Sequence, residues 1–126
     1  MKNIFYFSIS INYDYDLDVN AVNEKLGLKD AKVISYNDAK GPKKSAKILY
    51  KTKKYEAEYT DEYFEKFVQE LAKKQEIITN EVTNKNGELN ICVVFDGLKE
   101  KPCLYMSNDT IKTLANLNAS FDVDII

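Results

Sequence analysis

The sequence contains no histidine, no tryptophan and no arginine, so all eighteen of its basic residues are lysines. Without histidine, the chain lacks the commonest general base and metal ligand, and Ser-His-Asp and Cys-His catalysis are excluded in their usual forms. Without arginine, it has no planar fork for bidentate binding of phosphate, carboxylate or guanine. An enzyme would have to work with Lys, Tyr, Asp, Glu or Cys alone. We therefore expect a protein that is not an enzyme and uses no cofactor.

Long apolar runs and a strong excess of one charge are also absent. No run approaches the roughly 20 apolar residues that span a bilayer. The first residues alternate between polar and apolar types and do not form the apolar core of a signal peptide. Twenty acids against eighteen lysines give a net charge of −2, which is too balanced to indicate a nucleic-acid or membrane partner. We expect one domain, residues 1–126, in the cytoplasm.

Only two cysteines are present, Cys92 and Cys103, and their spacing matches no C-x-x-C motif or metal-binding cluster. A hairpin over residues 88–106 would place them opposite each other, where a disulfide is geometrically possible. The simpler interpretation is two free, half-buried thiols in a reducing compartment.

Three strands are predicted in the first half of the chain. Period-two alternation is clearest over residues 3–11, and the apolar face of this strand should point entirely into the core. That face consists of Phe5, Phe7, Ile9 and Ile11. Weaker alternation predicts strands over residues 31–36 and 46–52. Residues 55–59 either extend the last of these or lead into the next helix.

Two amphipathic helices are predicted around these strands. The first follows an acidic loop, where Asp16 or Asp18 can cap its free N–H groups, and it ends at the next glycine. The stronger one spans residues 61–74, with Thr60 as its expected N-cap and acidic residues in its first turn. A shorter, weaker helical piece is predicted over residues 75–84.

The last third of the chain follows the order strand, strand, helix, strand. Residues 89–95 are apolar on both sides, which predicts a central strand covered on both faces. A short return strand is predicted over residues 103–106 and a final strand over residues 121–126. A helix should begin between them at Ser107. Its residues expected to face inward are Ile111, Leu114 and Ala115.

This order of elements predicts an α+β fold. The sheet should be antiparallel or mixed with helices packed on one face, as in a ferredoxin-like or related two-layer sandwich. Strand, helix and strand over residues 3–36 are echoed over residues 90–126, with the strongest helix between them. The strand order does not follow from one sequence.

Short motifs at both ends of the chain are similar to those of a known family. They are Phe7-Ser-Ile-Ser10, Asp16-Leu-Asp18 and Leu26-Gly27-Leu28 near the start, and Leu104-Tyr-Met-Ser107 and Phe121-Asp-Val-Asp-Ile125 near the end. Together they resemble the bacterial domain-of-unknown-function family 4279 over nearly the whole chain. The family usually has a tryptophan in the third-strand region, where Tyr50 stands here. The resemblance implies a small α+β domain and supplies no catalytic residue.

The sharpest chemical feature is a run of alternate carboxylates, Asp14, Asp16 and Asp18. Such oxygens could converge on Ca²⁺, but an EF-hand loop starting at Asp14 needs Gly at its sixth position and Glu at its twelfth. Val19 and Lys25 stand there, so we expect no metal site.

Two interpretations of this acidic loop remain open. Its carboxylates can simply cap the following helix and face solvent. Alternatively, tyrosines that alternate with the acids make an interaction surface, because tyrosine is enriched at binding hot spots. On this second interpretation, the candidate partner-binding residues are Tyr13, Asp14, Tyr15, Asp16 and Asp18.

Two further charged features have simple explanations. Seven lysines lie between residues 40 and 54, and a solvated edge strand protected from aggregation by lysine explains them better than phosphate binding does. Asp122 and Asp124 lie one pleat apart on the last strand and are expected to face solvent.

These features favour a non-enzymatic protein-binding protein, most of all an immunity protein that neutralises a bacterial toxin by direct binding. The partner would then be another protein, a cognate toxin, whose basic surface would suit the acidic loop. The alternative is a small-ligand-binding or regulatory module with a pocket between its sheet and helices.

Overall fold

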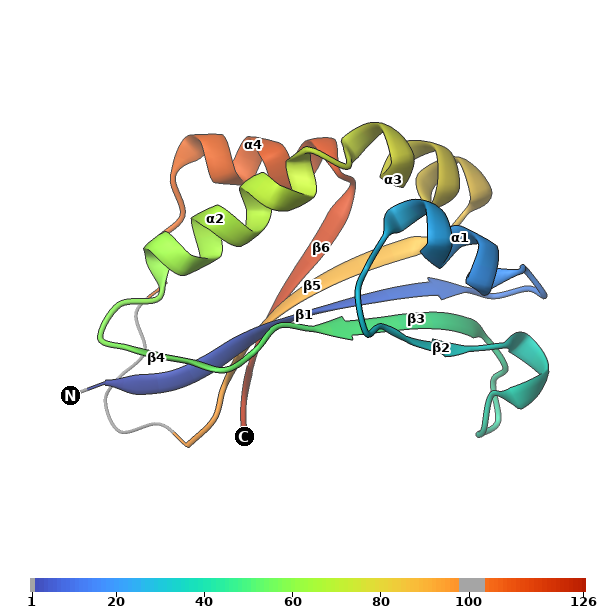
Figure 1. Ribbon diagram of the computed structural model, residues 1–126, viewed down its shortest axis with the longest axis horizontal. Helices are drawn as coiled ribbons and strands as arrows, with labels where there is room; N and C mark the ends of the chain where they lie inside the picture. The colour runs from blue at the N-terminus through green and yellow to red at the C-terminus, as the bar shows by residue number, and fades with distance from the viewer. Residues whose placement is uncertain (1, 98–103) are drawn as a thin grey trace.

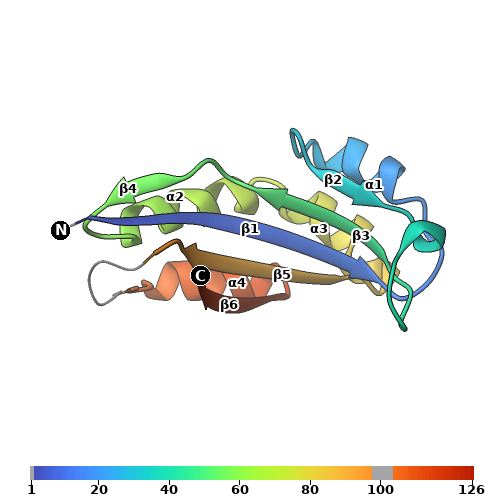
Figure 2. The same ribbon diagram turned by 90° about the horizontal axis from the view of Figure 1, so that it is seen from below.

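The protein has two layers, a β-sheet and a set of helices that all lie on one side of it (Figure 1). The computed structural model describes residues 2–97 and 104–126. The helices are α1 (Val19–Leu26), α2 (Asp61–Ala72), α3 (Gln75–Glu81) and α4 (Asn108–Asn116), with short 3₁₀ turns at Tyr36–Asp38 and Thr83–Lys85. In Figure 2 the sheet is seen from below, and no described helix crosses that face. The predicted α+β class with helices on one face is confirmed.

Six strands of the described residues make up the sheet. They are β1 (Asn3–Tyr13), β2 (Lys32–Ile34), β3 (Ala46–Lys51), β4 (Tyr55–Ala57), β5 (Glu88–Phe95) and β6 (Ala119–Ile125). Their order is β2-β3-β1-β5-β6, and β4 pairs with the start of β1. Every pair is antiparallel except β5 with β6, which is parallel.

This topology contains the ferredoxin-like arrangement. Strand β3 lies between β1 and β2, and β5 pairs with the other side of β1, which is the split βαβ pattern. The parallel β5-α4-β6 unit then extends the sheet at one edge. Strand β3 was predicted to be an edge strand, and this is wrong because β2 pairs with its outer side.

The core lies between β1, β5 and the helices. As predicted, the apolar face of β1 is buried throughout, and each of its side chains is at most 2% exposed. Phe7 contacts Phe64 and Phe67 of α2, with ring centroids 5.4 and 5.1 Å apart. Aromatic pairs at such distances add to the stabilisation from apolar burial. The packing of α2 on β1 is therefore largely aromatic.

Strand β5 is central, but the prediction that both its faces are covered is wrong. Leu89, Ile91 and Val93 are buried under the helices, whereas Asn90 and Cys92 are only half-buried on the opposite face. The apolar run misled because Cys92 and Val94 stand on a face that no described helix covers, although Val94 itself is only 5% exposed.

The inward face of α4 is shifted relative to the prediction. Ile111 is 51% exposed and Ala115 is also exposed, while Leu114 is buried as expected. The side chains that face inward beside Leu114 are Thr110 and Leu117. Because α4 packs against α2 and β6, its contacts set the buried face one residue away from the most apolar stripe.

Two of the three predicted helix caps use their side chains. The carboxylate of Asp18 accepts a hydrogen bond from the Ala21 N–H, and the Ser107 hydroxyl accepts one from the Thr110 N–H. Thr60 stands at the N-cap of α2 without a side-chain cap bond. The reason is that its backbone is already helical, whereas a capping side chain requires an extended N-cap.

The predicted return strand is not formed where the chain is described. Residues 104–106 have no strand structure, and β6 occupies the place beside β5. Among the described residues, Cys92 is a free cysteine, and Cys103 lies outside them. None of the helices in residues 2–97 and 104–126 has the length and apolarity needed to cross a membrane.

Candidate functional site

Tyr13 was predicted to be an exposed partner-binding residue, and this is wrong. It is the last residue of β1 and only 1% exposed, and its hydroxyl donates a 2.6 Å hydrogen bond to the backbone carbonyl of Glu81. Burial raises the pKa of this phenol well above its usual value, and the nearby Tyr15 and Glu81 raise it further. Tyr13 therefore anchors the sheet to α3 and cannot meet a partner.

The other four residues of the acidic loop remain at the surface. Tyr15 is 38% exposed, and its hydroxyl donates to the Lys85 carbonyl at 2.6 Å. Asp18 is used in capping α1. The side chains of Asp14 and Asp16 are exposed and make no hydrogen bond or ion pair with another described residue. The loop is thus held at its aromatic positions and free at two carboxylates.

Glu81 links α1 to the end of α3 and the turn that follows it. Its two carboxylate oxygens accept hydrogen bonds from Lys25 of α1 at 2.8 Å and from Lys85 at 2.6 Å. These two ammonium groups lower the pKa of the carboxyl, and the effect outweighs the opposing effect of burial. Both oxygens of Glu81 are therefore occupied, which makes it a structural residue.

A cleft of about 530 Å³ opens on the helical side of the sheet, next to α2. It lies at the break between β3 and β4, where the chain stops pairing with β1 and then pairs with it again. At this break the Thr52 N–H donates to the Phe7 carbonyl at 2.9 Å, and the Thr52 hydroxyl accepts from the Phe7 N–H at 3.1 Å. The side chain of Thr52 thus replaces a strand partner and keeps the gap between β3 and β4 in place.

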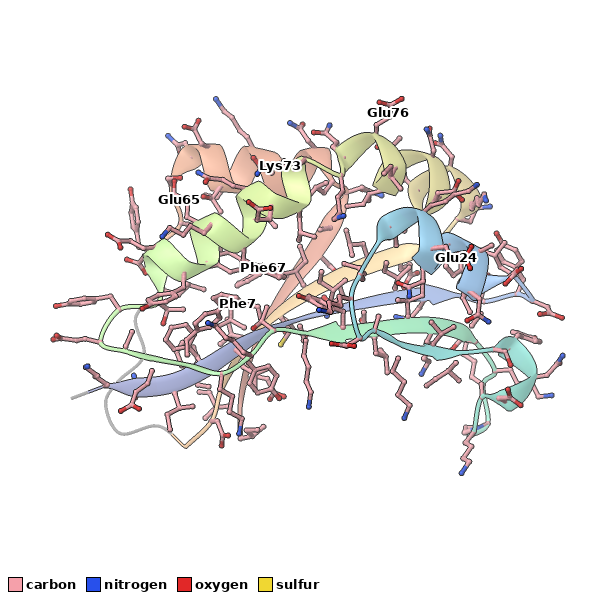
Figure 3. The ribbon with its side chains drawn as sticks, viewed as in Figure 1. Phe7, Glu24, Glu65, Phe67, Lys73 and Glu76 are labelled. Atoms are coloured by element: carbon pink, nitrogen blue, oxygen red, sulfur yellow. The ribbon has the colours of Figure 1, made fainter. Side chains whose placement is uncertain are left out.

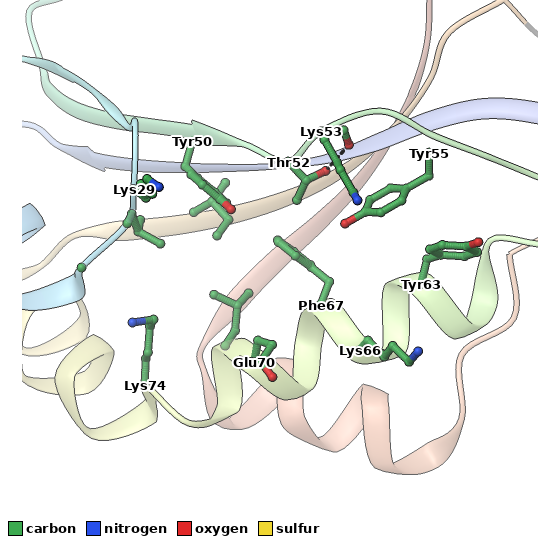
Figure 4. A pocket seen from close by; sticks show the side chains of 14 residues that line it. Lys29, Tyr50, Thr52, Lys53, Tyr55, Tyr63, Lys66, Phe67, Glu70 and Lys74 are labelled. Atoms are coloured by element: carbon green, nitrogen blue, oxygen red, sulfur yellow. Dashed lines mark hydrogen bonds between the residues drawn. The ribbon is translucent and has the colours of Figure 1, made fainter.

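Aromatic and apolar side chains form the floor of this cleft (Figure 4). Phe67 reaches from α2 toward the sheet, where it contacts Phe7. The rings of Tyr55 and Tyr63 lie side by side with centroids 5.0 Å apart. Among the described residues, the apolar and aromatic lining consists of Ile9, Leu28, Tyr50, Tyr55, Tyr63, Phe67 and Leu71.

Positive charge surrounds the cleft. Its charged lining residues are Lys29, Lys53, Lys66, Lys74 and Glu70. Glu70 forms its ion pair with Lys73 at 2.9 Å, outside the cleft lining. Lys74 donates to the Leu26 carbonyl at the end of α1, at 2.7 Å, and Lys53 lies over the Tyr55 ring at 5.6 Å. No cleft lysine has an ion-pair partner in the described part of the chain.

Polar groups without a partner among the described residues line the cleft. The hydroxyls of Tyr50, Tyr55 and Tyr63 make no hydrogen bond with other described residues, so they are available to a ligand. Within residues 2–97 and 104–126, no group of three His, Cys, Asp or Glu side chains is placed to hold a metal ion. A cavity of this size, apolar with a few polar groups, is typical of a small-molecule site.

A pocket between sheet and helices was predicted from the sequence, but its residues were not. The lining comes from β1, β3, β4, α2 and the segment after α1, so it depends on how these elements are brought together. One signal was present, since Tyr63 and Phe67 lie one turn apart on a helix that also carries Lys66.

The fold and the cleft together define a two-layer α+β domain of the ferredoxin-like type with an open cleft beside α2. The chain belongs to the family described as domain of unknown function DUF4279, whose model matches residues 3–126. No curated protein and no solved structure matches the chain.

Proposed function

We propose that this protein is a non-enzymatic binding protein whose cleft holds a small anionic molecule with a flat ring. The observation that carries the proposal is the set of lysines without ion-pair partners around an aromatic floor. The proposal takes up the second of the two functions expected from the sequence, the ligand-binding module.

The preference for an anion follows from the charges. Four lysines and one glutamate line the cleft, in a protein whose net charge is −2. Each ammonium acts as a point charge that accepts many anion geometries, unlike the fixed fork of arginine. The site therefore favours carboxylate, sulfonate or phosphate groups without demanding one exact shape.

The preference for a flat ring follows from Tyr55, Tyr63 and Phe67. Their faces and edges can form offset or edge-to-face contacts with an aromatic ligand. The free tyrosine hydroxyls can then orient polar substituents on it. The described lining of the cleft contains no histidine or cysteine, and its single carboxylate is paired with Lys73, so binding without catalysis is the function that we propose.

The test is titration with 8-anilinonaphthalene-1-sulfonate, a fluorescent aromatic sulfonate. We expect saturable binding at one site, and the double variant Lys53→Glu with Lys66→Glu should weaken it by roughly tenfold or more, which is about 1.4 kcal/mol. The variant Lys43→Glu with Lys44→Glu is a matched control, because both lysines are exposed in a distant loop. Equal binding by both double variants, or no saturable binding, would refute the proposal.

A second candidate is the immunity protein expected from the sequence. It is favoured by the exposure of Asp14, Tyr15, Asp16 and Asp18 at one end of the molecule. Complementary charge would speed encounter with a basic toxin. Purified protein should then bind the product of the adjacent reading frame, and Asp14→Lys with Asp16→Lys should slow association. If association is unchanged, the loop is not the binding surface.

A further inference from the structure

The sheet face opposite the helices takes no part in the cleft. In Figure 2 the strands β3, β1, β5 and β6 lie across this face with the helices behind them. Because side chains alternate along each strand, every second residue lies on this open face. From β1 these are Ile4, Tyr6, Ser8, Ser10 and Asn12, all of them half-buried.

Strand register arranges the side chains of this open face in rows. Ser8 pairs with Lys51 on one side and Cys92 on the other, and Cys92 pairs with Asp122. This row therefore runs from a lysine on β3 to an aspartate on β6. In a parallel row, Asn12 pairs with Lys47 on one side and Glu88 on the other.

The charges on the open face are separated by strand. Strands β2 and β3 contribute only lysines, namely Lys32, Lys47 and Lys51. Strands β5 and β6 contribute only acids, namely Glu88, Asp122 and Asp124. The central β1 is uncharged here. The exception is Glu56 on the short β4, beside Ile4 at one end of the sheet.

We propose that the open face binds a second copy of this chain. A two-fold axis parallel to the strands and lying between two stacked sheets places β2 and β3 of one copy over β5 and β6 of the other. The lysines on β2 and β3 of each copy then face the acids on β5 and β6 of the other copy. This contact occurs twice, as the symmetry of an isologous dimer requires. Facing sheets pack about 10 Å apart, a gap that lysine and aspartate side chains span together.

Half-buried apolar groups support the same arrangement. Tyr6, Ile34 and Leu49 lie on this face with part of their surface open, and Val94 is nearly covered. A second sheet would bury what remains exposed of these side chains, and apolar burial is worth roughly 25 cal/mol per Å². The charged strands on the two sides of β1 then fix how the two copies are oriented. A two-fold axis perpendicular to the strands would place β6 over β6, so that acidic residues would face acidic residues.

The experiment is a charge-swap complementation followed by sedimentation velocity over a dilution series. Lys47→Glu with Lys51→Glu gives both the β2–β3 side and the β5–β6 side of the open face a net negative charge. Asp122→Lys with Asp124→Lys gives both sides a net positive charge. We expect the wild-type chain to dimerise, more weakly as salt is added. Each double variant alone should lose affinity by roughly tenfold or more. An equimolar mixture of the two should form a heterodimer.

Matched controls carry the same charge changes on the helical layer. Glu65 and Glu76 point away from the sheet (Figure 3), and both are exposed. Glu65→Lys with Glu76→Lys, and Lys73→Glu with Lys112→Glu, should dimerise like the wild type. Circular dichroism confirms that each variant is folded.

Three outcomes would overturn the proposal. They are a wild-type chain that stays monomeric throughout the series, swapped variants that dimerise as the wild type does, and a mixture that stays monomeric. Because the cleft lies on the helical side and the open face on the other, failure here leaves the result with the aromatic sulfonate unaffected. Conversely, failure of ligand binding does not affect this test.

Discussion

At the scale of single residues, two tyrosines in one loop illustrate how burial decides a role. Tyr13 and Tyr15 each donate a 2.6 Å hydrogen bond to a backbone carbonyl, but only that of Tyr13 is buried. Their rings meet edge to face with centroids 6.0 Å apart. The phenol of Tyr13 therefore stabilises the buried core, whereas the phenol of Tyr15 packs on a turn at the surface.

We predict that Tyr13→Phe lowers the free energy of unfolding by about 1–3 kcal/mol, because the buried Glu81 carbonyl loses its donor. Tyr15→Phe should cost less than about 1 kcal/mol, since water can replace an exposed hydrogen bond. Urea unfolding of the two variants beside the wild type provides the measurement. Equal losses would contradict the structural role of the Tyr13 hydroxyl.

At the scale of elements, the ion pairs of Glu81 join α1 to α3 in a pH-dependent way. Lys25 and Lys85 lower the pKa of this carboxyl in the folded chain. The stabilisation is therefore complete above the unfolded pKa of about 4.3 and is lost as the pH falls through the lower folded value.

We accordingly predict that Glu81→Gln is less stable than the wild type at pH 7 and that the difference shrinks as the pH is lowered toward 3. Thermal unfolding midpoints across this range measure it. Glu76→Gln on the same helix is the control, because Glu76 is exposed and has no ion pair among the described residues. A difference that stays constant with pH would show that packing, not charge, explains the loss.

At the scale of the whole molecule, β1 is the centre of the sheet. It pairs with β3 and β4 on one side and with β5 on the other, whereas β2 and β6 stand at the edges. We predict that backbone amides of β1 and β5 exchange hydrogen most slowly and those of β2 among the fastest of the strands, since core strands open only with global unfolding. Faster exchange in β1 than in β2 would contradict this order.

The predictions that succeeded depend on local patterns. The alternation in residues 3–11 indicated both a strand and its buried face, and Asp18 and Ser107 were recognisable caps. Tyr13 continues the same alternation by one more step, so its burial was already signalled by its odd position. Because acidic residues follow Tyr13, it was predicted to belong to the loop instead.

The predictions that failed depend on neighbours distant in the sequence. Both faces of β5 look apolar, and only the pairing with β1 and β6 shows which face the helices cover. The inward face of α4 could lie at Thr110 or Ile111 until α2 and β6 are placed beside it. The cleft likewise joins residues from Ile9 to Lys74, which no local pattern connects.

The position of β1 has a consequence for how the chain is made. Phe5 pairs with Phe95, so these two neighbouring strands of the sheet lie far apart in the sequence. During synthesis β1 leaves the ribosome before β5, and its apolar face stays incompletely covered until the intervening residues and β5 have followed. Such distant pairing slows folding and leaves apolar surface open to wrong partners meanwhile. Strand β1 is thus made before β5 but cannot be fully enclosed until β5 has been made.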